Sequence, residues 1–119
     1  WLDEYIPEIA ISDAKRLPTI AALADMLGGA GRVRVEELGI PIDCTDGFTE
    51  AFYARPERLL DPAVRAAQSV WKFVPDGAVA RFERTLAADL ATGEWDRRHG
   101  RFRTMPEFRG ALRLVVSSG

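Results

Sequence analysis

The sequence predicts an α/β fold in which two strands flank a long helical segment. Apolar residues recur at helical spacing through most of residues 46–100. Residues 32–38 alternate charged and apolar side chains, which is typical of a strand with one covered face. Residues 111–116 are apolar at nearly every position, as in a strand covered on both faces inside a sheet. Two strands cannot form such a sheet alone, so we expect further strands outside this chain.

The size and composition indicate part or all of one globular domain. A chain of 119 residues with 47% apolar residues can bury a core, at about 100–200 residues per domain. The longest apolar run, 112–116, is far shorter than the roughly 20 residues of a transmembrane helix, which excludes a membrane span. The first residues show no secretory signal pattern, and the single Cys44 cannot form an internal disulfide, so we expect a cytoplasmic protein. One His and one Cys also exclude a Cys/His zinc site, and we expect no metal.

Charge is distributed unevenly along the chain. The net charge of −2 argues against a dedicated nucleic-acid-binding protein. Residues 1–50 hold 10 acids and 4 bases, whereas residues 51–119 hold 8 acids and 12 bases. The second part therefore contains the candidate surface for an anionic partner.

Helices are expected before the first strand. Pro7 suits a first helical turn, and residues 1–17 carry a short apolar helical face. Thr19 suits the N-cap of a helix over 19–28. The glycine-rich stretch 28–31 suits the end of that helix, because glycine readily adopts left-handed conformations. A nucleotide-binding loop would instead follow a strand and open a helix.

The helical segment 46–100 contains two longer predicted helices. Asp61, followed by a proline, suits the N-cap of a helix whose apolar residues continue at helical spacing to Val74. Asp76 suits the cap of the next helix, which carries one apolar stripe and ends at Gly93. The first of these helices has two apolar stripes, so we expect contacts on more than one side.

A succession of segments runs through essentially the whole chain. These are Tyr5-Ile-Pro-Glu, Leu17-Pro-Thr-Ile-Ala-Ala-Leu, Ile40-Pro-Ile-Asp-Cys-Thr-Asp-Gly-Phe, Tyr53-Ala-Arg-Pro-Glu, Leu60-Asp-Pro-Ala-Val-Arg, Gly93-Glu-Trp-Asp-Arg-Arg-His-Gly and Leu112-Arg-Leu-Val-Val. In this order they resemble the C-terminal part of the class I S-adenosylmethionine-dependent methyltransferases, which have a Rossmann-like fold. No single segment is diagnostic, and the resemblance rests on the succession.

The resemblance implies a place for each predicted element. Residues 32–38 would be the sixth strand of a seven-stranded sheet, at its edge, and 111–116 the seventh, in its interior. Residues 46–100 would be a helical insertion that forms a lid over the substrate. The loop and acidic residue with which the family binds its cofactor belong to an N-terminal half that is absent from residues 1–119. S-adenosylmethionine would therefore be bound by that half, and no cofactor-binding residue is expected here.

The segment after the first strand is the main candidate for substrate binding. Asp43 and Asp46 could hold a substrate amine or orient a nucleophile, but the pattern favours structural roles, with Asp46 starting a helix and Asp43 closing a turn. The nearby aromatic residues Phe48, Phe52 and Tyr53 could form an apolar wall of a substrate pocket. The spacing of the acids does not fit a calcium loop.

A second candidate is the arginine-rich stretch that begins at Arg97. It could bind phosphates, or it could be a solvated and ion-paired surface, because acidic residues flank it. His99 could serve as a general base, since histidine titrates near neutral pH. The sequence does not single out a catalytic residue.

The sequence thus predicts the substrate-side C-terminal part of a methyltransferase that acts on a small-molecule acceptor. Its partners would be that acceptor and the N-terminal half of the same polypeptide, and the 119 residues alone are predicted to be inactive. The alternative is a helical interaction module that binds an anionic partner through the arginine-rich strip 97–113.

Overall fold

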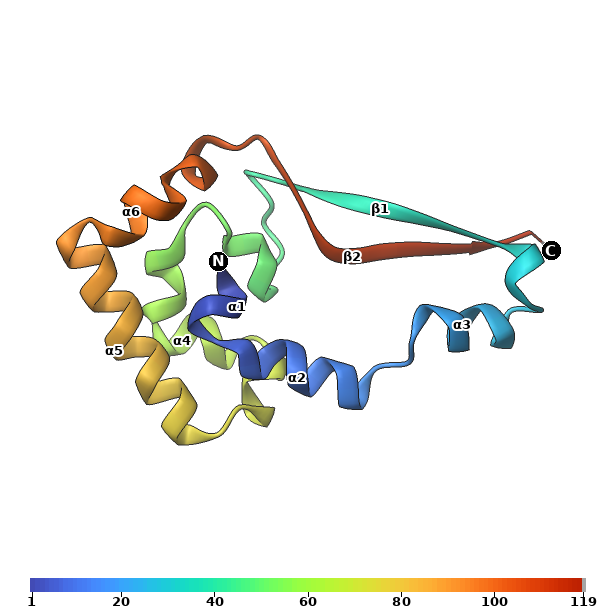
Figure 1. Cartoon of the computed structure of the whole chain (residues 1–119), viewed down its shortest axis with the longest axis horizontal. Coiled ribbons are helices and arrows are strands. Elements are labelled where there is room, and N and C mark those ends of the chain that lie inside the picture. The colour runs from blue at the N-terminus through green and yellow to red at the C-terminus, as the bar shows by residue number, and fades with distance from the viewer. Residues whose placement is uncertain (119) are drawn as a thin grey trace.

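The molecule has a helical part on one side, from which a two-stranded sheet extends (Figure 1). The structure is a computed structural model, and it describes residues 1–118. The N-terminus lies within the helical part, and the described chain ends at the far end of the sheet (Figure 1). The sheet gives the molecule a long axis of 52 Å.

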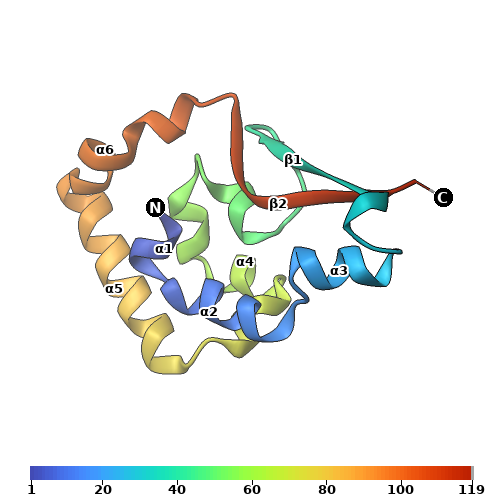
Figure 2. The same cartoon turned by 45° about the vertical axis from the view of Figure 1, so that its right-hand side comes forward.

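The two strands pair with each other in antiparallel orientation. Strand β1 spans Val33–Pro41 and strand β2 spans Glu107–Ser117. Both extend beyond the predicted ranges. Figure 2 shows the short helix α3 (Ile20–Met26) below the end of the sheet where β1 begins and β2 ends.

The pairing shifts register near the middle of the strands. Glu37 is paired with Arg113 and Gly39 with Arg109, so Leu38 alone lies opposite the three residues between these two arginines. Such a bulge bends the strand that carries the extra residues and redirects its side chains. β2 bends visibly along its length (Figure 1).

Two short helices precede α3, and contacts with the helical insertion hold the first of them in place. These are α1 (Leu2–Tyr5) and α2 (Pro7–Arg16), with Pro7 in the first turn as predicted. The Tyr5 hydroxyl donates a hydrogen bond to Asp89 Oδ2 at 2.6 Å and accepts one from Arg98 Nη2 at 2.8 Å. Burial, followed by the hydrogen bond to Asp89, raises the pKa of Tyr5 far above its usual value.

The capping residues of α3 act as the sequence predicts. Thr19 Oγ1 accepts a hydrogen bond from the backbone N–H of Ala22 at 3.0 Å. Gly28 and Gly29 follow the helix with φ of 103° and 98°, a conformation that other residues rarely adopt. The glycine-rich stretch therefore ends a helix and leads into β1.

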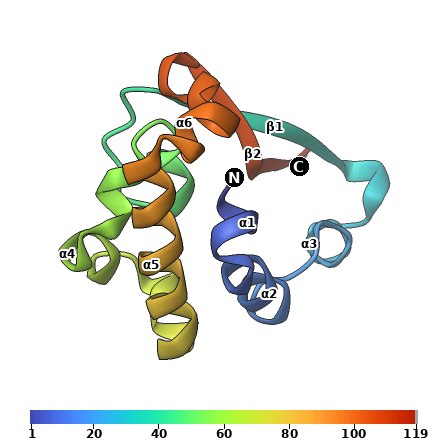
Figure 3. The same ribbon diagram turned by 60° about the vertical axis from the view of Figure 1, so that its left-hand side comes forward.

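The helical insertion, which is the segment between β1 and β2, consists of 3-10 turns and three α-helices. The α-helices are α4 (Pro62–Ala66), α5 (Asp76–Thr92) and α6 (Glu94–His99). The 3-10 turns are η2 (Thr49–Phe52), η3 (Pro56–Leu60), η4 (Ser69–Phe73) and η5 (Gly100–Thr104). Figure 3 shows α4, α5 and α6 gathered on the side of the molecule away from α3.

The helix predicted from Asp61 to Val74 is wrong in its length. Asp61 Oδ1 caps α4 by accepting from the N–H of Ala63 at 2.9 Å, but α4 then ends after one turn. Gln68 is extended, with φ −112° and ψ 121°, and its side chain is engaged in hydrogen bonds with other parts of the chain. Asp76 also differs from the prediction, because it is the first residue of α5 and makes no capping hydrogen bond.

The core lies inside the helical part and extends to the near end of the sheet. Its largest fully buried side chains come from α5, α6, the 3-10 turns, the N-terminal segment and β1: Trp95, Tyr53, Phe82, Ile6, Ile40, Leu59, Leu86 and Pro56. The single apolar stripe predicted for α5 is therefore its buried face.

The sheet is less well covered than the helical part. Leu112 and Leu114 of β2 are 41% and 42% exposed, and Val35 of β1 is 43% exposed. The predicted interior position of the last strand thus remains a prediction that depends on parts of the sheet outside this chain.

Candidate functional site

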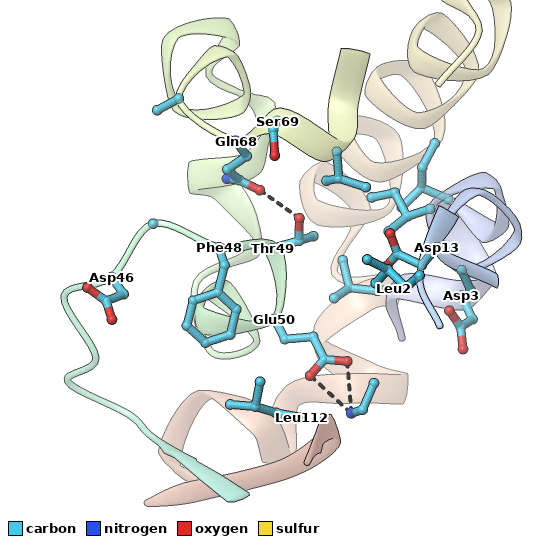
Figure 4. Close-up of a pocket in the computed structure, with 18 residues that line it drawn as sticks. Leu2, Asp3, Asp13, Asp46, Phe48, Thr49, Glu50, Gln68, Ser69 and Leu112 are labelled. Carbon is cyan, nitrogen blue, oxygen red and sulfur yellow. Dashed lines mark hydrogen bonds between the residues drawn. The ribbon is translucent and has the colours of Figure 1, made fainter. Parts of the chain in front are cut away.

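One pocket lies where the N-terminal helices, the insertion and the sheet meet. It has a volume of about 860 Å³, which falls in the range of small-molecule sites. Its walls come from α1 and α2, from residues 46–50, from residues 67–70 and from Ala111 and Leu112 of β2. Figure 4 shows Phe48 and Glu50 between the Asp46 loop and the N-terminal helices, with Leu112 beside Glu50.

A buried hydrogen-bond network holds the insertion's contribution to this pocket. Gln68 is 5% exposed, and its Oε1 accepts hydrogen bonds from Thr49 Oγ1 at 2.6 Å and from Trp71 Nε1 at 3.0 Å. Its Nε2 donates to the carbonyl of Val64 at 3.3 Å. Because Gln68 joins η2 to η4, it sets the spacing between two walls of the pocket.

A second contact joins the insertion to the bulge of β2. The Glu50 carboxylate accepts a hydrogen bond from the backbone N–H of Ala111. Ala111 lies in β2 but is not paired with any residue of β1. Gly110 leaves room for this contact, because a Cβ there would press against Glu50 Oε2 and lie 2.7 Å from Phe108 Cε1. The bulge therefore positions Ala111 and Leu112 in the pocket wall.

The predicted substrate residues separate into two groups. Asp46 and Phe48 line the pocket, and their role in substrate binding stays a prediction. Asp43 lies on the exposed turn after β1 and does not line it. Asp46 is exposed and does not cap η2, whose N-cap is Phe48 without a side-chain hydrogen bond.

Phe52 and Tyr53 belong to the core rather than to the pocket wall. Tyr53 is 1% exposed, and its hydroxyl donates a hydrogen bond to the carbonyl of Met105 at 2.6 Å. Burial, and then the charges of Glu107 and Asp43, raise the pKa of Tyr53. Phe52 is also buried, with the Arg55 guanidinium 5.2 Å from its ring centroid. Their predicted contact with a substrate remains untested, but their packing gives both a structural role.

His99 lies outside the pocket, among aromatic rings at the end of α6. Its Nε2 is 2.8 Å from Glu4 Oε2, and its ring packs against Tyr5, Trp95 and Phe102. This arrangement ties α6 to α1 and gives His99 a structural explanation.

The arginines of the strip 97–113 are largely paired with acids. Arg98 contacts Glu4, Asp89 and Glu94, and the other ion pairs are Arg97 with Glu94, Arg103 with Asp96 and Glu57, Arg109 with Glu107, and Arg113 with Glu37. Within residues 1–118, Arg101 of this strip has no acidic partner and lies over the Phe102 ring at 4.5 Å. The strip offers little free positive charge to an anionic partner.

Several pocket residues were not predicted from the sequence. They come from the N-terminal helices and from the break after α4: Leu2, Asp3, Asp13, Leu17, Gln68 and Val70. The apolar face of residues 6–10 was visible in the sequence, but nothing indicated that it would face the segment after β1. The bulge of β2 carried no recognisable signal beyond Gly110.

The described residues offer neither a cluster of metal ligands nor a membrane-spanning helix. Within residues 1–118, no cluster of three or more His, Cys, Asp or Glu side chains is arranged to hold a metal ion. None of the helices in that range combines the length and apolar character that a membrane crossing requires.

The fold can be compared with known proteins. No family model and no curated protein matches the chain. Among solved structures, it is similar to the crystal structure of a "putative methyltransferase from antibiotic biosynthesis pathway" from Anabaena variabilis ATCC 29413. The two are 28% identical and superpose with a TM-score of 0.85. The chain has a methyltransferase-like fold.

The similarity covers 99% of this chain and 48% of the methyltransferase chain from Anabaena. The chain thus spans about half the length of that protein. Because 99% of this chain is covered, the similarity includes both the bulged strand pair and the helical insertion.

Proposed function

We propose that this chain is the acceptor-side part of a class I methyltransferase that transfers a methyl group from S-adenosylmethionine to a small molecule. The observation that carries the proposal is the similarity over 99% of the chain to a protein described as a methyltransferase. The pocket between α1, α2 and the insertion supplies a cavity of suitable size for the acceptor. The resemblance noted in the sequence supports the class of cofactor.

The described residues do not fit a cofactor-binding loop. The glycines at 28–31 follow α3 and lead into β1, whereas a cofactor loop needs a helix N-terminus behind it. We therefore assign S-adenosylmethionine to polypeptide outside these residues, where the related fold has its N-terminal half. When bound, the cofactor supplies an electrophilic methyl group.

The chain's own contribution is to bind and orient the acceptor. Apolar residues of α1 and α2 face the segment 46–50 across the pocket, so an acceptor would be held between them and shielded from water. The Gln68 network fixes one wall, and the contact from Glu50 to Ala111 fixes another. No general base is required of these residues when the accepting atom carries no proton that must be removed.

The exposed apolar residues of the sheet support a polypeptide partner. Val35, Leu112 and Leu114 are partly exposed on a sheet of two strands, which is too small to be stable by itself. Ile20 and Leu27, in and just after α3, are exposed as well. We propose that the N-terminal half of the same polypeptide covers these positions.

A methyl-transfer assay with a pocket-filling variant tests this function. The complete polypeptide that contains this chain is incubated with S-adenosylmethionine and a panel of small acceptors, and the S-adenosylhomocysteine product is measured. Ala10→Trp would fill the pocket from an exposed position of α2, so we expect a higher KM for the acceptor and unchanged cofactor affinity.

Ala14→Trp is the matched control, because Ala14 is exposed on the same helix and does not line the pocket. If none of the acceptors is methylated, the proposed reaction is contradicted. If Ala10→Trp has the same KM and kcat for the acceptor as the wild type, the pocket does not bind the acceptor.

A further inference from the structure

We propose that the acceptor carries a positive charge next to an apolar body, and that the charge is recognised by carboxylates around the pocket. This inference rests on the proposed function, since it names the class of molecule that the same pocket takes. It starts from the composition of the pocket wall, which combines an apolar surface with charges of a single sign.

All the charged residues that line the pocket are acidic. The described lining contains no Lys, Arg or His, although the chain has 16 Lys and Arg residues against 18 acids. The acidic lining residues are Asp3, Asp13, Asp46 and Glu50. They come from α1, α2 and the segment after β1, so they lie on more than one side of the cavity (Figure 4).

The four acids differ in how far the protein neutralises them. Asp13 pairs with Arg16 at 3.1 Å, so its charge is largely balanced. Glu50 accepts a hydrogen bond only from the backbone N–H of Ala111, and this neutral donor does not neutralise the carboxylate charge. Asp3 and Asp46 make no ion pair within residues 1–118. This contrasts with the arginine-rich strip, where most cations have acidic partners.

The remainder of the wall is apolar and suits a hydrocarbon body. It is formed mainly by Leu2, Ile6, Ile9, Phe48, Val70 and Leu112. An apolar surround lowers the effective dielectric constant, so a carboxylate at the pocket edge attracts a cation more strongly than it would on an open surface. The same carboxylates repel an anion. The pocket should therefore select for the sign of charge as well as for apolar area.

The positive charge must be separate from the atom that accepts the methyl group. A protonated nitrogen has no free lone pair, so it cannot attack the methyl carbon. The accepting atom uses its own lone pair to bond that carbon while the carbon–sulfur bond breaks, and any proton it carries passes to water. The cationic group thus anchors the molecule, and a second nucleophilic atom reacts.

Binding of two matched probes tests the inference without the reaction. The probes are tryptamine, which is a cation at pH 7, and indole-3-propionate, which is an anion with the same ring. Their Kd values for the complete polypeptide are measured by calorimetry at low salt, without cofactor. Asp3 and Asp46 are exposed, so each carboxylate contributes modestly, and we expect tryptamine to bind about tenfold more tightly.

The charge variants show whether the pocket causes this preference. In Asp3→Asn/Asp46→Asn the ratio of the two Kd values should fall below about threefold. Asp25→Asn/Glu37→Gln removes the same number of charges away from the pocket and should keep the wild-type ratio. Equal affinity for the two probes, no measurable tryptamine binding, or an unchanged ratio in the pocket variant would each overturn the inference.

The methyl-transfer assay separates this inference from the proposed function. Methyl transfer to neutral or anionic acceptors only would overturn the charge preference and leave the methyltransferase intact. A tryptamine preference that depends on Asp3 and Asp46, without methyl transfer to any acceptor, would support the pocket's charge selectivity and overturn the proposed reaction.

Discussion

The Glu50 carboxylate accepts a hydrogen bond from the backbone N–H of Ala111. Its Oε1 and Oε2 lie 3.1 and 3.2 Å from the Ala111 nitrogen. Ala111 lies in the part of β2 that bulges out opposite Leu38, where the strand pairing is interrupted. A side chain of the insertion thus satisfies a backbone donor that the sheet leaves without a register partner. This links the shape of the pocket wall to the irregularity in β2.

We expect Glu50→Ala to lower the free energy of unfolding by about 1–2 kcal/mol. The substitution leaves the Ala111 N–H without its charged acceptor, although partial exposure allows water to replace some of the bond. Urea denaturation of the complete polypeptide measures the change. Glu50→Gln keeps one acceptor oxygen and should cost less than half as much, and equal losses in the two variants would contradict the assigned contact.

Gly110 is required for close packing at the same bulge. A Cβ at this position would press against the Glu50 carboxylate and lie 2.7 Å from Phe108 Cε1. The Phe108 ring cannot move freely, because it packs against Tyr53 and Phe102 at 5.1 and 5.8 Å between centroids. We therefore expect Gly110→Ala to cost about 1–3 kcal/mol.

Gly47→Ala provides the control, since a Cβ there meets nothing within 4 Å and its φ is not in the left-handed region. Thermal melting of both variants compares them directly. A Gly110→Ala variant as stable as Gly47→Ala would show that the bulge has room to spare.

The Gln68 network predicts a non-additive effect on stability. Gln68→Leu would leave the buried Thr49 hydroxyl and the Trp71 N–H without an acceptor, at a cost of about 2–4 kcal/mol. Thr49→Val removes one of these unsatisfied groups, so the double variant should lose less than the sum of the single losses. Chemical denaturation of the four proteins in this cycle gives the coupling energy, and strict additivity would contradict the contact.

Most of the caps, though not Asp76, and the two strands could be read from the sequence because they depend on neighbouring residues. Thr19, Asp61 and the glycines after α3 act locally, and the strand patterns reflect the period of two. The break at Gln68 could not be read, because it depends on partners far along the chain, such as Thr49. An uninterrupted helical pattern from 61 to 74 gave no warning of that contact.

The candidate site shows the same division. Asp46 and Phe48 were proposed because polar and aromatic residues stand together after a strand, and both residues line the pocket, although their contact with a substrate stays a prediction. Tyr53 belonged to the same cluster in sequence, yet its hydroxyl reaches Met105 and its ring is buried. Which members of an aromatic cluster face a cavity is decided by tertiary packing, and the sequence pattern does not contain it.

Acidic pH should weaken the attachment of α1 to α6. Burial alone would raise the pKa of Glu4, but hydrogen bonds from Arg98 and His99 outweigh it and hold that pKa below its usual 4.5. A carboxyl group whose pKa is lowered by folding stabilises the protein above the unfolded-state pKa, and this contribution is lost as pH falls through the folded-state value. Stability should therefore decline below about pH 4.5, by less than about 1 kcal/mol from this partly exposed group.

Urea denaturation between pH 3 and pH 7 measures this decline. Glu4→Gln should be less stable than the wild type at neutral pH and should approach it in acid. Asp25→Asn is the control, because Asp25 is an exposed acid on α3 without an ion pair among residues 1–118. A constant difference between wild type and Glu4→Gln across the pH range would refute the linkage.

The last prediction concerns two positions on the same face of the sheet, one on each strand, and the proposed cover of that sheet. Leu114 lies partly exposed on β2 opposite Glu36, and Arg34 lies on the neighbouring strand with its side chain 69% exposed. If the N-terminal half of the polypeptide covers the sheet, Leu114→Asp would bury an unpaired charge in the complete protein and cost several kcal/mol. Arg34 lies on β1, the predicted edge strand, so Arg34→Asp replaces a charge that stays exposed and should cost less than about 1 kcal/mol. Thermal melts of the two variants in the complete polypeptide compare these costs, and equal melting temperatures would mean that the last strand is not in the interior of a larger sheet.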